Sequence, residues 1–518
     1  MNSAWMILAS GPVQLTPARS QMGFTLGFHI LLVPLGVALP TLMLIANYKG
    51  LKRGDAAALS LARRWSHAAG LTFAVGAVTG TVLSFEFGLL WPGFVKTFGD
   101  VFGLPFAIEG ISFFLEALLV AIYIYGWRRM KPWTHFWFGF PIPFVAIIGA
   151  LSIISVNSWM NAPAGFTIGS DGRPTKVDPF NVIFNKALPW ELTHFLIAAY
   201  MAATFMVASV YVVGWLRGRR DRYHRLGILI PFTIGAILAP IQALVGDQIA
   251  RWVYQNQPAK FAAMEIVTNS GTHQPEYLFG IYHPSTNTVT GGIKIPGLDS
   301  WLAGGSTSTF VQGMNSIPPQ NRASNPTLVH FAFDVMVGIG TLLPLVALYY
   351  AIAYWRRRNV PHGRIFLWVA AACGVLAYIA IEAGWITTEV GRQPWIVWNI
   401  ARTSGAVTTA QSVTVTMIVI YVLYALLGIA TIAVLRAMAT RWRIKPVIDD
   451  DETSPYGPRP DAVAAMAGET AEAGALAESG VDGAAGRRST SATETATDTA
   501  TDTGADSATE SRDRRPKS

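Results

Sequence analysis

Residues 190–215 read WELTHFLIAAYMAATFMVASVYVVGW, an almost unbroken apolar run that contains His194. A helix needs about 20 apolar residues to cross roughly 30 Å of hydrocarbon, so this run predicts a transmembrane helix. The whole chain of 518 residues is 52% hydrophobic and only 14% charged. Soluble proteins carry about 25% charged residues, and the deficit indicates a protein that lies in the lipid bilayer.

Further runs of the same character predict an all-α polytopic membrane protein with about nine transmembrane helices. An odd number of spans places the two termini on opposite sides of the membrane. The expected spans are 22–47, 68–92, 103–127, 134–158, 190–215, 226–249, 328–354, 364–388 and 411–437.

Clusters of lysine and arginine occupy the first, third, fifth and seventh loops between these spans. Basic residues gather in cytoplasmic loops, so we expect the N-terminus outside and the C-terminus in the cytoplasm. These loops account for the formal net charge of +8, which therefore does not indicate a nucleic-acid partner. The basic residues are Lys49, Lys52, Arg53, Arg63 and Arg64; Arg128, Arg129 and Lys131; Arg217, Arg219, Arg220, Arg222 and Arg225; Arg356, Arg357, Arg358 and Arg364; and, after the last span, Arg436, Arg441, Arg443 and Lys445.

Two segments differ from the apolar spans and their short loops. The sixth loop, residues 250–327, is long and is expected outside, where its Gly, Pro and mixed charges favour a structured lid. Residues 446–518 repeat Ala, Gly, Thr, Asp and Glu, which predicts a disordered cytoplasmic tail after a membrane domain of residues 1–445. The single cysteine, Cys373, excludes disulfides and thiolate metal sites.

Ionisable side chains are costly inside a membrane and are therefore functional candidates. In the expected orientation, five potential ligands from five spans lie in the outer half of the membrane. Four of them lie within a span, and the fifth, Glu389, lies at the end of the eighth span. These five potential ligands are His29, Glu109, His194, Met336 and Glu389; the further ionisable candidates are Glu116, His330, Asp334 and Glu382.

Each of these residues also has a purely structural interpretation. A membrane histidine can be a hydrogen-bonded packing residue, a methionine can fill a gap in the core, and Arg392 can neutralise Glu389. Their joint occurrence favours iron. A His–Met pair is an axial set for a low-spin heme, and a heme held by one side chain keeps an open position for a gas.

Glu109 and Glu116 are seven residues apart, which places them on one face of a helix and about 10 Å apart along its axis. This spacing suits a ladder for protons, in which Glu116 is the deeper residue. The structural alternative is a pair of buried, protonated acids that only form hydrogen bonds.

At the level of motifs, the chain resembles subunit I of cytochrome bd-type quinol oxidases over residues 20–445. The resemblance rests on the order and the spacing of the motifs. They are FHILLVP (28–34), GDVFGLPFAIEGISFFLE (99–116), NSWM (157–160), THFLIAAY (193–200), FAFDVMVG (331–338) and EAGWITTEVGRQPW (382–395).

The resemblance implies three hemes in a heme-binding helical bundle. His194 and Met336 match the axial ligands of a low-spin heme b. His29 and Glu389 match the ligands of two high-spin hemes, with Glu109 close to them. One high-spin heme is a heme b and the other is usually a heme d, and the resemblance does not assign either ligand to a particular heme.

Further family positions surround the hemes. Arg19 and Arg392 match arginines that pair with heme propionates, and Trp385 matches a tryptophan between hemes. The chain departs from the family at Asp334, because an arginine is common two residues before the methionine ligand. This departure predicts a different redox potential for the low-spin heme.

Quinol binding is expected in the outer loop. In QPAKFAAME (257–265), Lys260 and Glu265 match positions associated with quinol binding, and Gln257 is a further candidate. The loop is short for the family. It is similar to the cyanide-insensitive branch, in which heme d can be replaced by heme b.

The resemblance thus implies an electrogenic terminal oxidase of a respiratory chain in the bacterial cytoplasmic (inner) membrane. Quinol is oxidised outside and releases its protons there, and O2 is reduced to water at the high-spin heme pair. Glu116 and Glu109 deliver protons from the cytoplasm, so charge separates across the bilayer without a pump. The expected partners are a second large membrane subunit, subunit II, and a small accessory subunit.

Three other classes of membrane protein fit less well. A heme-copper oxidase needs a histidine cluster with two adjacent histidines, which the sequence lacks. Many secondary transporters have inverted repeats, and no such repeat is evident here. A diheme, non-oxidase membrane cytochrome b normally has histidine pairs on two helices, and this chain has too few suitably placed histidines.

Overall fold

The structure is a computed structural model, which describes residues 12–444 and 455–456. Within this part of the chain, nine helical segments are long and apolar enough to cross a membrane, and they confirm the nine expected spans. The segments are Leu15–Arg53, Ala56–Leu90, Pro92–Gly126, Pro132–Asn161, Leu188–Leu216, Arg222–Asn256, Pro326–Arg357, Arg364–Gly391 and Val413–Arg443.

Two of these segments consist of two helices each. The first contains α2 (Leu15–Ile30) and α3 (Val33–Arg53), and the fourth contains α6 (Pro132–Gly139) and α7 (Pro141–Asn161). Both α3 and α7 have a proline in their first turn, where the missing N–H does no harm. The other long helices are α4 (Ala56–Leu90), α5 (Pro92–Gly126), α9 (Leu188–Leu216), α10 (Arg222–Asn256), α13 (Pro326–Arg357), α14 (Arg364–Gly391) and α16 (Val413–Ile444).

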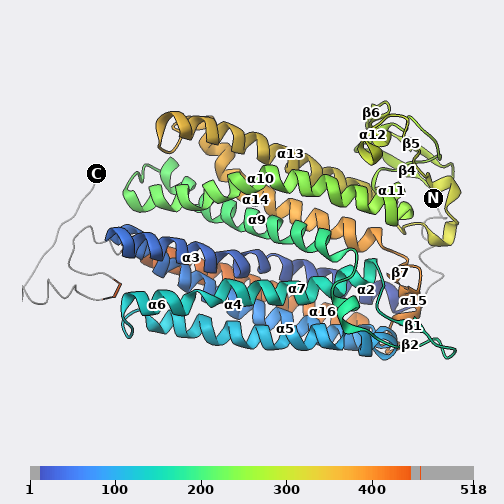
Figure 1. Ribbon diagram of the computed structural model, residues 1–518, viewed down its shortest axis with the longest axis horizontal. Coiled ribbons are helices and arrows are strands. Elements are labelled where there is room, and N and C mark those ends of the chain that lie inside the picture. The colour runs from blue at the N-terminus through green and yellow to red at the C-terminus, as the bar shows by residue number, and fades with distance from the viewer. Residues whose placement is uncertain (1–11, 445–454, 457–518) are drawn as a thin grey trace, which may run out of the picture. The chain divides into compact units, whose positions relative to one another are not determined.

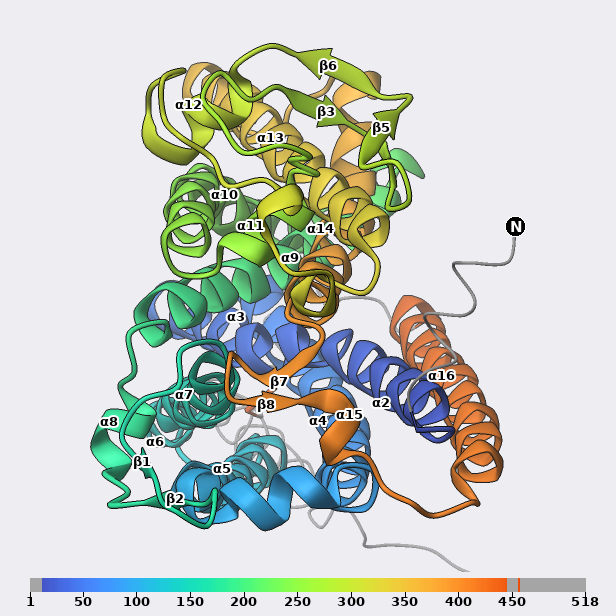
Figure 2. The same ribbon diagram turned by 90° about the vertical axis from the view of Figure 1, so that its right-hand side faces the viewer.

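The long helices pack as two groups of four. In one group, α9, α10, α13 and α14 contact one another in a ring, and in the other α3, α4, α5 and α7 do the same. Helix α9 joins the groups because it also packs against α3 and α7. Helices α2 and α16 pack against each other and against α4, at one side of the bundle (Figure 2).

The short elements gather at one end of the bundle, at the right of Figure 1. They form four two-stranded antiparallel sheets, β1–β2, β3–β6, β4–β5 and β7–β8, with short helices between them. This end contains the long loop that was expected to be structured. The elements are β1 (Thr167–Ile168), β2 (Pro174–Thr175), α8 (Pro179–Ile183), α11 (Pro258–Met264), β3 (Glu276–Leu278), β4 (Ile281–His283), β5 (Thr288–Thr290), β6 (Ile293–Ile295), α12 (Leu298–Gly304), the 3-10 helices η1 (Met314–Ser316) and η2 (Pro319–Asn321), β7 (Trp395–Val397), β8 (Ala401–Arg402) and α15 (Thr403–Ala406).

The basic loops meet at the opposite end. Asp55 caps the N-terminus of α4 by accepting a hydrogen bond from the N–H of Ala58, and it also pairs with Arg222 of the fifth loop at 2.7 Å. The guanidinium of Arg225 donates to the carbonyl of Arg358 in the seventh loop at 3.2 Å. The first, fifth and seventh loops therefore lie on one side, as the charge pattern predicts.

The expected disordered tail of residues 446–518 lies outside the described residues, apart from Pro455 and Tyr456. The Tyr456 hydroxyl lies 3.0 Å from Oδ1 of Asn47 and 2.8 Å from Nδ1 of His135, and its ring packs on Trp127. These contacts are near the basic loops. The boundary of the membrane domain at residue 445 stays a prediction.

The orientation can be tested by cysteine labelling, because Cys373 is buried and is the single cysteine of the chain. Asp171 and Arg220 are exposed in loops at opposite ends of the bundle. A membrane-impermeant maleimide should label Asp171→Cys in intact cells and Arg220→Cys only after permeabilisation. The unsubstituted chain should stay unlabelled in both conditions, and the reverse pattern would show that the expected orientation is wrong.

Candidate functional site

His29 lies near the end of α2, with its ring against α4. Its Nδ1 is 2.8 Å from Oγ1 of Thr79, and that hydroxyl donates its own hydrogen to the carbonyl of Val75 or Gly76. With this hydroxyl hydrogen on a backbone carbonyl, Thr79 accepts from Nδ1–H of His29, and Nε2 is then available as a ligand. A Cβ at Gly80 would lie 3.2 Å from the ring, so glycine leaves room beside it.

Glu382 approaches His29's helix from α14. A Cβ at Gly27 would lie only 3.2 Å from Oε2 of Glu382. Its other oxygen, Oε1, is buried and has no hydrogen-bond partner among residues 12–444 and 455–456. A carboxyl group placed in this way can accept a proton or face a polar group that the protein itself does not provide.

Glu86 of α4 is a second acid beside α2. It is 4% exposed and accepts hydrogen bonds from Gln21 Nε2 at 2.7 Å and Thr25 Oγ1 at 2.6 Å. Glu86 is absent from the sequence-based candidates, although it lies inside the expected span 68–92. The rule applied to the other membrane acids also applies to Glu86 and identifies it as a candidate.

His194 lies in the second turn of α9 and faces α10. The Nε2 atom of Gln242 on α10 is 3.2 Å from both ring nitrogens. Oε1 of Gln242 is buried and has no hydrogen-bond partner within the described part of the chain. The amide can thus offer a donor or, after a half-turn, an acceptor to whichever ring nitrogen does not hold a ligand.

Met336 of α13 approaches α14 at Gly384. A Cβ at Gly384 would lie 3.0 Å from Sδ of Met336, so glycine is needed for this close approach. The next residue, Trp385, packs edge-to-face on Phe195, with 6.3 Å between ring centroids. Phe195 directly follows His194. Met336 and Phe195 therefore contact neighbouring residues of α14, while His194 itself faces Gln242 and Gly246 of α10.

Glu389 lies at the end of α14 that faces the short strands. It accepts a hydrogen bond from Nδ2 of Asn157, in the NSWM motif, at 2.8 Å and is paired with Arg392. Arg392 is 3% exposed, and its Nε and Nη1 atoms have no hydrogen-bond partner among the described residues. Arg392 therefore pairs with Glu389, as one interpretation predicts, and keeps two donors for another anionic group.

Lys260 of α11 is buried against the same end of α14. A Cβ at Gly391 would lie 3.2 Å from its Cγ atom. Burial lowers the pKa of Lys260 to about 8, although the nearby carboxylates of Glu191 and Glu389 favour its charged form. Lys260 is thus a buried cationic donor beside two carboxylates.

Two side-chain amides connect the surroundings of Lys260 with α7. Gln257 is fully buried, and its Nε2 donates to the carbonyl of Asn161 at 2.9 Å. Nδ2 of Asn161 in turn donates to Oε1 of Glu191 at 2.9 Å. Glu191 is also absent from the sequence-based candidates, although it lies inside the span 190–215 and three residues before His194.

Glu265 lies in a different cluster from Lys260. The charged groups that raise its pKa, after burial itself, are Glu276 and Asp334. Asp334 accepts a hydrogen bond from the N–H of Phe279 and lies 3.2 Å from Nε2 of His330. The structure therefore does not bring Lys260 and Glu265 to one cluster, although the motif places them five residues apart.

Glu109 lies halfway along α5, because this helix begins at Pro92 and not at residue 103 as expected. Glu116 follows two turns later on the same face, in the direction of the basic loops. Arg19 is half-buried near the start of α2, and no ion pair among the described residues involves it. Its charge is therefore open to an anionic group.

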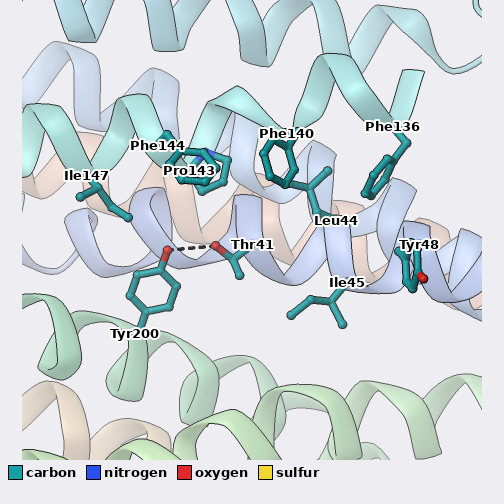
Figure 3. Close-up of a pocket in the computed structure, with 10 residues that line it drawn as sticks. All are labelled: Thr41, Leu44, Ile45, Tyr48, Phe136, Phe140, Pro143, Phe144, Ile147 and Tyr200. Atoms are coloured by element: carbon teal, nitrogen blue, oxygen red, sulfur yellow. Dashed lines mark hydrogen bonds between the residues drawn. The ribbon is translucent and has the colours of Figure 1, made fainter. Parts of the chain in front are cut away.

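A separate pocket lies between α3, α6, α7 and α9 (Figure 3). Its lining is apolar apart from three hydroxyl groups, two of which, those of Thr41 and Tyr200, form a hydrogen bond of 2.9 Å. It has no carboxylate and no histidine, so it is not a metal or proton site. The lining residues are Thr41, Leu44, Ile45, Tyr48, Phe136, Phe140, Pro143, Phe144, Ile147 and Tyr200.

Comparison with known proteins identifies one family. Residues 17–442 match the family model described as cytochrome bd terminal oxidase subunit I. The chain is 35% identical over 444 residues to a putative cytochrome bd menaquinol oxidase subunit I of Bacillus subtilis, with 84% of this chain and 98% of the relative covered. It is 30% identical over 430 residues to a cytochrome bd ubiquinol oxidase subunit 1 of the same organism, with 80% and 91% covered.

A solved structure agrees with these matches. The chain is similar to a chain of the bd oxidase from Geobacillus thermodenitrificans, with a TM-score of 0.77 and 35% sequence identity. The match covers 83% of this chain and 99% of that chain. The similarity therefore extends over the whole helical bundle and is not limited to a single motif.

Proposed function

The chain belongs to the cytochrome bd terminal oxidase subunit I family, and we propose that the buried polar residues described above are the functional groups of this quinol:oxygen oxidoreductase. As a bd-type cytochrome, the protein is a heme protein and one subunit of a membrane complex with a subunit II. Neither a transporter nor a non-oxidase cytochrome b is favoured by the comparisons.

The described residues fit hemes in two respects. With Nδ1 donating to Thr79, Nε2 of His29 has a free lone pair for iron. Arg392 has unpaired donors suited to a propionate. Bound heme would supply iron that carries electrons and binds O2.

Each ligand has a proposed place. His194 and Met336 hold the low-spin heme b, with Trp385 beside them. His29 and Glu389 each hold one of the two high-spin hemes, of which one is a heme b and the other a heme d or a second heme b. Arg19 and Arg392 pair with propionates. The observation that carries this proposal is that Met336 and Phe195, the residue after His194, contact the adjacent positions Gly384 and Trp385 of α14.

Quinol is proposed to bind at the end of the bundle that carries the short strands. Lys260 donates a charge-assisted hydrogen bond to a quinol oxygen, and Gln257 holds the neighbouring amide chain in position. Glu265, which the motif also associates with quinol binding, lies in the separate cluster with Glu276 and Asp334, and we assign it to the support of this loop. Oxidation of quinol to quinone releases two protons and two electrons, and the protons leave on this outer side.

Protons for water formation are proposed to come from the other side. Reduction of O2 to two waters consumes four protons and four electrons. Two quinol molecules supply the four electrons. Glu116 and Glu109 lie on one face of α5 and can pass protons from the basic, cytoplasmic end to Glu109, halfway along the helix. Because protons are released outside and taken up inside, the reaction is electrogenic.

The membrane location follows from the family, and the orientation follows from the charge pattern of the loops. We place the chain in the bacterial cytoplasmic membrane, with its basic loops in the cytoplasm. Large apolar side chains are exposed along α16, including Val415, Ile418, Val419 and Val422, and these meet lipid or subunit II. A small accessory subunit is a further proposed partner.

The low-spin heme ligand can be tested by absorption spectroscopy of the purified complex. His194→Ala should abolish the low-spin b signal in the reduced-minus-oxidised spectrum, because an axial ligand is lost. His67→Ala is the matched control, since His67 contacts the backbone carbonyl of Arg63 at the start of α4 and is no candidate ligand. A low-spin signal that survives His194→Ala intact would disprove the ligand assignment.

Lys260 should affect quinol affinity alone. Lys260→Ala should raise the quinol KM about tenfold or more, because a hydrogen bond to a charged group contributes about 1.5–3 kcal/mol. The heme spectra should not change, and Lys260→Arg should recover part of the loss. Lys294→Ala, at an exposed lysine of the same loop, should leave the KM unaltered. An unchanged KM for Lys260→Ala would remove this lysine from the quinol site.

Glu116 should affect turnover and not quinol binding. Glu116→Gln keeps the shape of the side chain but cannot release a proton, so we expect kcat to fall about 100-fold. Quinol KM and reduction of the hemes by quinol should stay normal. Glu116→Asp retains a carboxyl group and should recover activity. If steady-state oxygen consumption by Glu116→Gln equals that of the unsubstituted enzyme, the acid is structural.

A further inference from the structure

Three carboxyl groups of the long outer loop lie together outside the membrane spans. Glu265 follows α11, Glu276 begins β3, and Asp299 lies in the first turn of α12. One oxygen from each lies within 4.8 Å of the others. The residues are 2%, 3% and 0% exposed, so they are shielded from bulk solvent. We call these three residues the carboxylate cluster.

The carboxylate cluster lacks the hydrogen bonds that buried oxygens normally have. Oε2 of Glu265, Oε2 of Glu276 and both carboxylate oxygens of Asp299 are buried without any hydrogen-bond partner among the described residues. Buried polar atoms are nearly always paired, and an unpaired charge in a dry site is strongly unfavourable. The four unpaired oxygens therefore point to a group that the chain itself does not supply.

The neighbouring histidine does not supply the missing hydrogen bonds. Nδ1 of His330 faces the carbonyl oxygen of Met264 at 2.6 Å, and Nε2 faces that of Tyr277 at 2.6 Å. Both ring nitrogens therefore face backbone carbonyl oxygens, and the four unpaired oxygens of the cluster accept no hydrogen bond from the ring. The nearest carboxylate to the ring is Asp334, at 3.2 Å from Nε2, and this fourth acid adds further negative charge next to the cluster.

We propose that Glu265, Glu276 and Asp299 bind one divalent cation, and that this cation is Ca²⁺. Carboxylate oxygens without nitrogen or sulfur are the ligands of hard cations. Ca²⁺ binds oxygens at about 2.3–2.6 Å, so two oxygens up to about 4.6–5.2 Å apart can share one ion. Mg²⁺ needs shorter bonds and retains several waters, which a site this dry does not accommodate.

The cation links three parts of the loop that are distant in sequence. It joins the end of α11 to β3 and α12, and α11 carries Lys260 on its other side, against α14. Binding of Ca²⁺ therefore holds α11 in place as well as neutralising the carboxylates. This inference goes beyond quinol oxidation and does not depend on which residues hold the hemes.

The test uses the purified oxidase complex, stripped with a chelator and desalted. Metal analysis after incubation in about 1 mM CaCl₂, a concentration typical of extracellular sites, should find one Ca²⁺ per chain, and Ca²⁺ should raise the Tm. Glu276→Gln and Asp299→Asn should each weaken Ca²⁺ binding in calorimetry by about tenfold or more, because each removes a charged ligand. Asp171→Asn, at an exposed acid of another outer loop, is the control and should bind normally.

Two results would overturn the proposal. If the unsubstituted complex holds no more Ca²⁺ than the Asp299→Asn complex, and its Tm does not respond to chelator or Ca²⁺, the carboxylate cluster shares protons and binds no metal. If Mg²⁺ binds as tightly as Ca²⁺, the assignment to Ca²⁺ is wrong. The heme spectra report the proposed oxidase function separately, since a normal spectrum without bound Ca²⁺ refutes only the cation site.

Discussion

Hydrocarbon offers no hydrogen-bond partners to a polypeptide backbone, and the architecture of this chain follows from that constraint. Each long apolar segment is helical, so its N–H and C=O groups pair within the segment. Even the break between α2 and α3 keeps its bonds, because Leu31 and Leu32 donate to the carbonyls of Gly27 and His29. The described strands, which need a neighbour, occur only in the loops at one end.

The same constraint makes the side chains informative. A polar group in the bundle either has a partner, as Glu86 has in Gln21 and Thr25, or has a free atom that requires one. Glu382 and Arg392 belong to the second kind. Glu382 lies on α14, the helix that approaches Met336 and carries Glu389, and Arg392 directly follows this helix. Both unpaired groups therefore lie on or next to the helix of the proposed ligand Glu389.

Much of this architecture can be predicted from the sequence, because hydropathy measures the lipid-crossing part of each helix. Helix ends are less predictable. Helix α5 begins at Pro92, eleven residues before the expected span, because Lys96 and Asp100 lower hydropathy without disturbing helical hydrogen bonds. Contacts in the outer loop could not be predicted at all. Lys260 and Glu265 face different neighbours because the tertiary fold of the loop, not their spacing, decides what each side chain meets.

The contacts of Asp334 explain one departure from the family pattern. From the motif alone, an acid two residues before Met336 predicts an altered redox potential. Residues two apart on a helix point to opposite sides, however, so Met336 faces α14 while Asp334 faces the loop. There Asp334 accepts the N–H of Phe279 and lies beside His330. Its direct role is therefore to anchor the folded outer loop to α13, and any effect on the heme would act over a longer distance.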